Sequence, residues 1–148
     1  MNTKDSMMKK KWKGGIDFSI YIVSNADMTM ERISKGRLGE DAAATFLTKE
    51  GYKIVERNFR CPLGEIDIVA VDKGVLVFVE VKTRSSNKFG LPEEAVNRRK
   101  QHQMAKTAQV YISRKKLFNS PARFDVVAVI LSGEKIDVRV IRNAFEIG

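Results

Sequence analysis

The sequence predicts an α/β fold in which a mixed five-stranded sheet is flanked by helices, in the chain order α-β-β-β-α-β-β. Two segments with helical periodicity, at about 30–50 and 92–114, separate five short runs rich in β-branched and aromatic residues. Several of these runs are apolar on both faces, which is typical of a sheet covered by helices on both sides. At 148 residues the chain is long enough to form one domain with a substantial core.

The first helix is expected from about Met30 to Glu50, because it contains a strongly helix-forming Ala42–Ala44 run and is followed by Gly51. Glu40 lies on the same predicted helix face as small and apolar residues at helical spacing, which are Ala43, Ala44 and Leu47. Glu40 is therefore either a surface residue or a carboxylate that reaches a site on the sheet.

The remaining elements follow from apolar runs and from the residues that interrupt them. Pro92 is expected to open the second helix, with Glu93 and Glu94 in its first turn. Asp125, near the start of an apolar run, is interpreted as a structural cap. The expected segments are a strand at 52–60, a connector at 61–64, the hairpin described next, a helix from 92 to about 114, and strands at 124–131 and 135–145.

The central hairpin joins the apolar runs at 64–71 and 75–83. A two-residue loop at Lys73-Gly74 would place Asp67 directly opposite Glu80, and would place Glu65 opposite Lys82. Side chains alternate along a strand, so Glu80 and Lys82 share one face. A three-residue loop would instead move Asp67 to the other face.

Two opposed carboxylates repel one another, and ionised groups among buried strand residues are costly unless they are paired. A divalent cation would remove the repulsion, and oxygen donors favour Mg²⁺ or Mn²⁺. Lys82 could then orient or deprotonate a water, or hold a phosphate oxygen. The alternative is purely structural: Glu80 and Lys82 form a salt bridge and Asp67 caps a strand end.

The chain is strongly basic, with a formal net charge of +9 and a pI near 9.8. Such a charge favours polyanionic partners, of which nucleic acid is the commonest, while a membrane surface or plain solubility are the alternatives. The residues expected to contact nucleic acid lie in the loop after the hairpin and on the second helix: Arg84, Lys88, Arg98, Arg99, Lys100 and Gln101. Lys100 and Gln101 are expected nearest the carboxylates.

A single cysteine and a single histidine exclude an intramolecular disulfide and an ordinary Cys/His zinc site. His102 is interpreted as a surface histidine. These features, and the lack of an apolar run of about twenty residues, favour a cytoplasmic protein with no membrane association. Residues 1–30 are interpreted as a flexible basic tail, and residues 31–148 as the folded domain.

Four segments together resemble the YraN family, which is similar to archaeal Holliday-junction resolvases of the PD-(D/E)xK nuclease superfamily. They are Gly36–Glu40, Gly64–Asp67, Phe78–Arg84 and Arg123–Val127. The resemblance implies a restriction-endonuclease-like fold for residues 31–148. It also implies roles for single residues: Asp67, Glu80 and the backbone carbonyl of Val81 would hold Mg²⁺, Lys82 would assist the attacking water, and Glu40 would match the acidic residue of the first helix. Ile66 stands where the superfamily's name has proline.

The expected function is a metal-dependent endonuclease that hydrolyses phosphodiester bonds of DNA, with branched or junction DNA among its substrates. A homodimer is expected because resolving a junction requires two cuts. The main alternative is a non-catalytic nucleic-acid-binding protein that retains the nuclease fold, and a third is a scaffold that binds protein.

Overall fold

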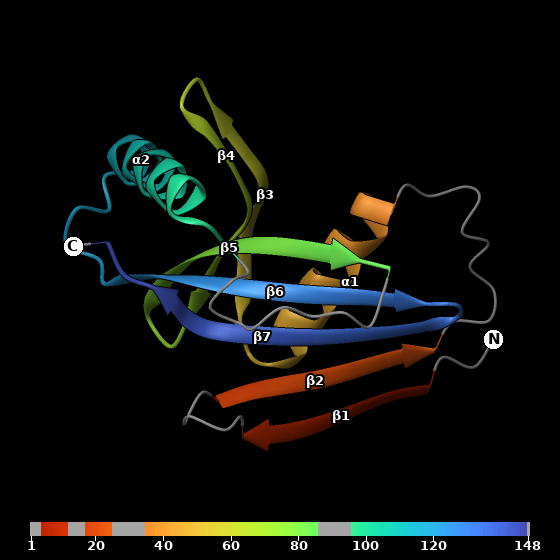
Figure 1. Ribbon diagram of the computed structural model, residues 1–148. Helices are drawn as coiled ribbons and strands as arrows, with labels where there is room; N and C mark the ends of the chain where they lie inside the picture. Colours follow the sequence, from red (N-terminus) through yellow and green to blue (C-terminus); the bar gives the residue numbers. More distant parts are fainter. Residues whose placement is uncertain (1–3, 12–16, 25–34, 86–95, 148) are drawn as a thin grey trace.

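A mixed sheet carries one helix on each face in the computed structural model, which describes residues 4–11, 17–24, 35–85 and 96–147 (Figure 1). The elements are β1 (Lys4–Lys11), β2 (Asp17–Ser24), α1 (Lys35–Lys49), β3 (Lys53–Cys61), β4 (Gly64–Asp72), β5 (Val75–Arg84), α2 (Arg98–Lys115), β6 (Ala122–Ser132) and β7 (Lys135–Phe145).

The sheet order is β1-β2-β7-β6-β5-β4-β3. Strands β5 and β6 are parallel, as expected for two strands joined through α2, and the other neighbours are antiparallel. The predicted α/β class and the order α-β-β-β-α-β-β from α1 onward are confirmed.

The N-terminal segment differs from the expected flexible tail, because β1 and β2 extend the sheet from five strands to seven. Strand β2 pairs with β7 from Ile20↔Arg139 to Ser24↔Lys135. Without β2, the backbone of β7 would present an unpaired edge in the described part of the sheet. The run of β-branched and aromatic residues in β2, Ile20–Val23, is too short for a membrane helix but has the right length for this pairing.

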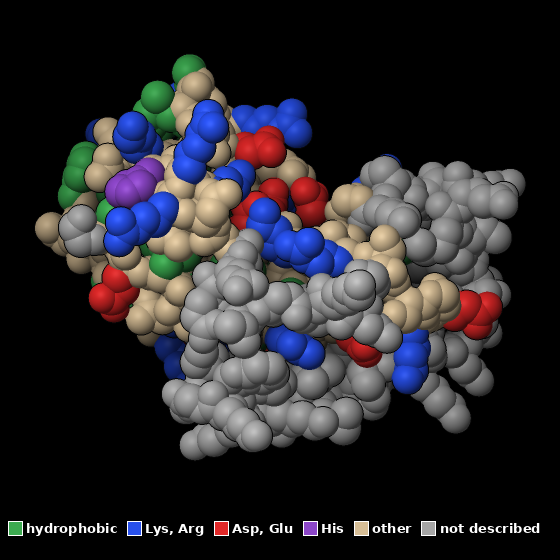
Figure 2. Space-filling model, viewed as in Figure 1, with side chains coloured by type: hydrophobic (Ala, Val, Ile, Leu, Met, Phe, Trp, Pro, Cys, Tyr) green, Lys and Arg blue, Asp and Glu red, His purple; other side chains and the backbone are tan. Residues whose placement is uncertain are grey.

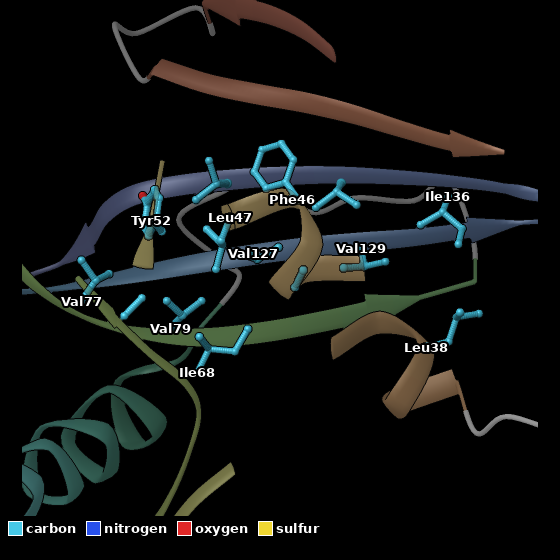
Figure 3. Close-up of a cluster of buried hydrophobic side chains, with 14 of the residues drawn as sticks. Leu38, Phe46, Leu47, Tyr52, Ile68, Val77, Val79, Val127, Val129 and Ile136 are labelled. Atoms are coloured by element: carbon cyan, nitrogen blue, oxygen red, sulfur yellow. The ribbon is translucent and has the colours of Figure 1, made fainter. Parts of the chain in front are cut away.

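One face of the sheet packs against α1 (Figure 3). Phe46 and Leu47 of α1 are fully buried there against strand residues such as Val79, Val127 and Val138. Burying aliphatic and aromatic side chains of this size contributes roughly 1.5–3 kcal/mol each. This packing fixes β5 and β6, the strands that carry one half of the site.

The other face packs against α2 through Phe59, Ile66, Phe78 and Tyr111. Tyr111 contacts both phenyl rings edge-on, with centroid distances of 5.1 Å to Phe59 and 5.8 Å to Phe78. These contacts hold α2 over β4 and β3.

Helix α2 begins later than expected. Asn97 has an extended backbone conformation, and its side chain accepts a hydrogen bond from the Lys100 amide at 2.9 Å, so Asn97 is the N-cap. The expected start at Pro92 is therefore wrong for residues 96 and 97, while residues 92–95 lie outside the described part of the chain. No helix in the described segments is long and apolar enough to cross a bilayer.

Two tight turns set the strand registers. Lys73 and Gly74 have φ values of 49° and 81°, and Asp72 pairs with Val75, so the predicted two-residue loop and its register are confirmed. Cys61 pairs with Gly64, so the expected connector is also a hairpin turn, formed by Pro62 and Leu63.

Candidate active site

The central hairpin opens into a fork at the candidate site. Strands β4 and β5 pair from Asp72↔Val75 as far as Ile68↔Val79. Beyond that point β4 stays paired with β3, and β5 continues along β6, so the two arms diverge (Figure 1). Asp67 is the next residue on one arm and Glu80 the next on the other.

The carboxylate of Asp67 bridges the fork. Its Oδ2 accepts a hydrogen bond from the Val81 amide at 2.7 Å. In a regular ladder, a carbonyl of the neighbouring strand would accept a hydrogen bond from a strand amide such as that of Val81. Because β4 has diverged, the Asp67 side chain accepts this bond instead. The Asp67 and Glu80 carboxyls lie close enough to shift each other's pKa, and each directly follows the last β4–β5 pair, Ile68↔Val79.

Two lysines from different elements share one oxygen of Glu80. The Nζ of Lys82, on the same strand face, lies 3.7 Å from Glu80 Oε1. The Nζ of Lys100, in the first turn of α2, lies 3.8 Å from the same oxygen. The Glu80 side chain is only 9% exposed, so these charges are weakly screened by solvent.

Burial is the main reason that both carboxyls resist ionisation. It raises the pKa of Glu80 to about 7, with a further contribution from the Asp67 carboxylate and opposition from Lys100 and Lys82. Burial also raises the pKa of Asp67, while the Val81 amide and Lys100 act in the opposite direction. Two acids with raised pKa values in one place are typical of functional sites.

The donor set suits a hard divalent cation. Asp67 and Glu80 supply carboxylate oxygens at one point, and such oxygens are the ligands that Mg²⁺ and Mn²⁺ prefer. In the described segments no group of three or more His, Cys, Asp or Glu residues is close enough to bind a metal. The protein ligands would therefore be these two acids and a backbone carbonyl, with Val81 the expected contributor.

Glu40 is not brought to the acidic pair. Its Oε2 lies 3.9 Å from Nη2 of Arg57, and the same guanidinium bonds Asp41 Oδ1 at 2.7 Å. The expectation that Glu40 supplies a third carboxylate finds no support in these contacts.

The predicted nucleic-acid contacts divide into four groups. Lys100 reaches the site, whereas Arg84, Arg98 and Arg99 are exposed around it. Gln101 is occupied locally, because its Nε2 donates to the Val96 carbonyl at 2.9 Å. Lys88 lies outside the described residues.

The first turn of α2 contains Arg98, Arg99 and Lys100 and no acidic residue. The peptide dipoles of a helix already place positive charge at its N-terminus, so cations there are unfavourable by about 0.3–1 kcal/mol each. Positive charge is thus concentrated beside Glu80 at a cost in helix stability.

Sequence reasoning missed a buried polar network at the other end of β5. Asp125 is fully buried and accepts hydrogen bonds from the Tyr52 hydroxyl at 2.7 Å and the Asn143 amide at 2.9 Å. Arg123 joins Asp125 to Asp72, with contacts of 3.0 and 2.7 Å. The structural role expected for Asp125 is confirmed, and its three partners come from the start of β3, from β6 and from β7.

The fold and the site define an α/β protein with paired acids and paired lysines at a fork in its sheet. Comparison with known proteins then gives the family. Residues 39–129 match the model of the family described as "Uncharacterised protein family UPF0102". The chain belongs to this family, and the expected YraN membership is confirmed.

Relatives in the family are similar over nearly their whole length. A UPF0102 protein of Moorella thermoacetica is 49% identical over 120 residues, which cover 80% of this chain and 100% of the relative. A UPF0102 protein of Clostridium acetobutylicum is 50% identical over 122 residues, with coverages of 80% and 100%. One from Trichlorobacter lovleyi is 53% identical over 114 residues, with coverages of 76% and 90%. None of these names states an activity.

Proposed function

We propose that the protein is a metal-dependent endonuclease that hydrolyses phosphodiester bonds of DNA. The observation that carries this proposal is the pair of carboxyls at the fork, the partly buried Asp67 and the buried Glu80, beside two lysines. A structural salt bridge needs only one of these acids. Two like charges placed together are unfavourable for folding alone, which favours a chemical role.

Asp67, Glu80 and the carbonyl of Val81 would hold Mg²⁺ or Mn²⁺. When bound, such an ion lowers the pKa of a water and polarises a phosphate oxygen. Lys82 would orient the attacking water or neutralise charge that develops on the phosphate. Lys100 can act on the same phosphate, because it reaches the same Glu80 oxygen from α2. The exposed arginines of that turn would hold the DNA backbone.

The activity is tested by incubating the purified protein with linear, nicked and four-way-junction DNA in Mg²⁺ or Mn²⁺. The variants Asp67→Asn and Glu80→Gln should lose cleavage, and Lys82→Ala should weaken it. Glu134→Gln is a matched control, because Glu134 is an exposed acid in the turn between β6 and β7. Equal cleavage by the wild type and by Asp67→Asn and Glu80→Gln would overturn the proposal.

Metal binding has a separate readout in thermal unfolding. Free Mg²⁺ or Mn²⁺ at a hundredfold excess over its dissociation constant stabilises a protein by about 2.7 kcal/mol if it binds only the folded state. We expect this stabilisation in the wild type and in Glu134→Gln, and its loss in Asp67→Asn and Glu80→Gln.

The second candidate is a nucleic-acid-binding protein that does not cut. DNA binding that weakens with salt, with no cleavage of any substrate and no metal-dependent stabilisation, would favour it. Preference for branched DNA is a finer part of the proposal and is tested by the same substrate panel. Homodimer formation is tested by sedimentation with and without junction DNA.

A further inference from the structure

A groove beside the candidate site has one apolar wall and one cationic wall. It has a volume of about 710 Å³ and lies between the tip of the β3–β4 hairpin and the first turns of α2. We call it the tip groove and define it by six of its lining residues: Pro62, Leu63, Arg99, Lys100, His102 and Lys106.

The apolar wall contains a large aliphatic side chain that is exposed to solvent and not packed into the core. Leu63 is 51% exposed at the turn of the hairpin. The turn itself is fixed, because Gly64 approaches α2 so closely that an added Cβ would lie 2.8 Å from Thr107 Oγ1 and 2.9 Å from Gln103 Cγ. A rigid turn therefore presents an aliphatic side chain to solvent over the groove.

The opposite wall carries positive charge. Arg99, Lys100 and Lys106 line the tip groove, and no carboxylate appears among its lining residues in the described part of the chain. A smaller adjoining hollow of about 350 Å³ shares Leu63 and Lys100 and adds Arg60 and Glu65, which pair with each other at 3.4 Å. In Figure 2, Lys and Arg side chains surround the histidine on the α2 side of the molecule, with apolar side chains toward the hairpin tip.

Lys100 connects the tip groove to the acids. It lines both hollows, and its Nζ lies 3.8 Å from Glu80 Oε1. A chain of phosphates lying along the cationic wall would therefore lead directly to the carboxylate pair.

We propose that the tip groove binds an unpaired stretch of a DNA strand, with bases against Pro62 and Leu63 and phosphates against the cations of α2. A nucleotide has an apolar base face and an anionic phosphate, and these match the two walls. In a blunt duplex the base faces are stacked inside the helix, so only the phosphates would be recognised. The inference rests on the proposed function in taking DNA as the substrate, and it narrows that substrate to strands with unpaired nucleotides.

The test measures binding in EDTA, where metal-dependent cleavage does not interfere. Labelled single-stranded DNA, a blunt duplex, and the same duplex with a single-stranded tail are titrated by fluorescence anisotropy at low salt. The wild type should bind the tailed duplex more tightly than the blunt one. Leu63→Ala should weaken binding of single-stranded and tailed DNA about fivefold, at the lower end of measured base-stacking effects, and should leave blunt-duplex binding within twofold.

Phe118→Ala is the matched control, because Phe118 is 69% exposed and does not line the tip groove. Arg99→Ala should weaken binding of all three DNAs alike and lower the salt dependence by about one phosphate contact. Thermal unfolding of each variant shows that it is folded, which is expected because Leu63 and Arg99 are exposed.

The only cysteine provides a second readout in the unmodified protein. Cys61 has a free thiol and lines the adjoining hollow. Single-stranded DNA should slow its alkylation, and blunt duplex should slow it less.

The inference is overturned if Leu63→Ala weakens blunt-duplex binding as much as tailed-duplex binding, if Phe118→Ala has the same effect, or if no DNA binds at low salt. If the protein binds tailed DNA more tightly than blunt DNA but cleaves neither in Mg²⁺ or Mn²⁺, the tip-groove proposal is supported and the nuclease proposal is rejected. If the protein cleaves DNA but binds tailed and blunt DNA equally, the nuclease proposal is supported and the tip-groove proposal is rejected.

Discussion

Asp67 accepts a hydrogen bond from the Val81 amide across the point where β4 and β5 separate. This hydrogen bond gives Asp67 a structural role in addition to its proposed chemical role. It holds one oxygen of the carboxylate against β5, and it brings the carboxyl group to Glu80.

Two substitutions separate the structural role of the Asp67 side chain, as a hydrogen-bond acceptor, from the effect of its charge. Both Asp67→Asn and Asp67→Ala remove the charge, but only asparagine retains an oxygen that can accept from Val81. We predict that Asp67→Ala is less stable than Asp67→Asn by about 1–2 kcal/mol in urea unfolding, because a partly buried amide loses its partner. Equal stabilities would show that water replaces the carboxylate at no cost.

Glu80 should make the metal-free protein less stable as the pH rises. Its pKa is about 7 in the fold and 4.5 ordinarily, so between these values the folded state binds more protons than the unfolded state. The protonated form therefore contributes stability below about pH 4.5, and this stability is lost as the pH rises through 7. A shift of this size corresponds to on the order of 3 kcal/mol.

Glu80→Gln removes this penalty. In EDTA, the stability gained by the substitution should increase from pH 5 to pH 8, as measured by denaturant unfolding at each pH. Glu134→Gln should show no comparable trend. A gain that did not depend on pH would contradict the raised pKa. A more stable but inactive variant is the behaviour expected when a residue is kept for chemistry.

Tyr52→Phe should destabilise the fold without reaching the site. The hydroxyl donates to Asp125 and accepts from Arg123 and Arg142 at 3.0 and 3.1 Å, so its loss should cost about 1–3 kcal/mol near pH 8. Burial and the Asp125 charge raise the pKa of Tyr52 well above 10. The wild type therefore loses the stability contributed by Tyr52 as the pH rises beyond 10, and the variant has no such contribution to lose. The difference between them should narrow at pH 11, while metal-dependent stabilisation at pH 8 stays intact.

Gly64→Ala should both destabilise the protein and weaken its binding of single-stranded DNA. Gly64 has a φ of 152° and lies against Thr107 and Gln103, so an added methyl group is strained and displaces the hairpin tip. We expect a loss of roughly 1–3 kcal/mol in thermal or urea unfolding. Gly36→Ala is the control, because Gly36 is helical with open space around it and should gain up to about 1 kcal/mol. A neutral Gly64→Ala would contradict the close packing of the tip.

The acidic pair was predictable because it depends on local rules. A two-residue turn at Lys73-Gly74 fixes the register, and the register alone places Asp67 and Glu80 directly after the last pair of β4 and β5. The fork itself was not predictable, since a regular ladder and a diverging one have the same alternation of side chains.

Other features depend on contacts between distant segments. Lys100 reaches Glu80 only because Asn97 starts α2 at that point and Tyr111 holds the helix on the sheet. The assignment of Glu40 came from resemblance and helix periodicity, neither of which shows that Arg57 would engage it. Strand β2 has a weak apolar pattern, and its pairing depends on the open edge of β7.

The divergence of β4 from β5 also bears on protein engineering. Some changes would close the fork by continuing the backbone ladder past Ile68 and Val79. They would pair more main-chain amides and carbonyls. They would also remove the unfavourable pairing of carboxylates that the fork now holds. A design procedure that rewards stability alone would favour such changes. It would produce a more stable protein in which a regular pair of strands replaces the candidate active site.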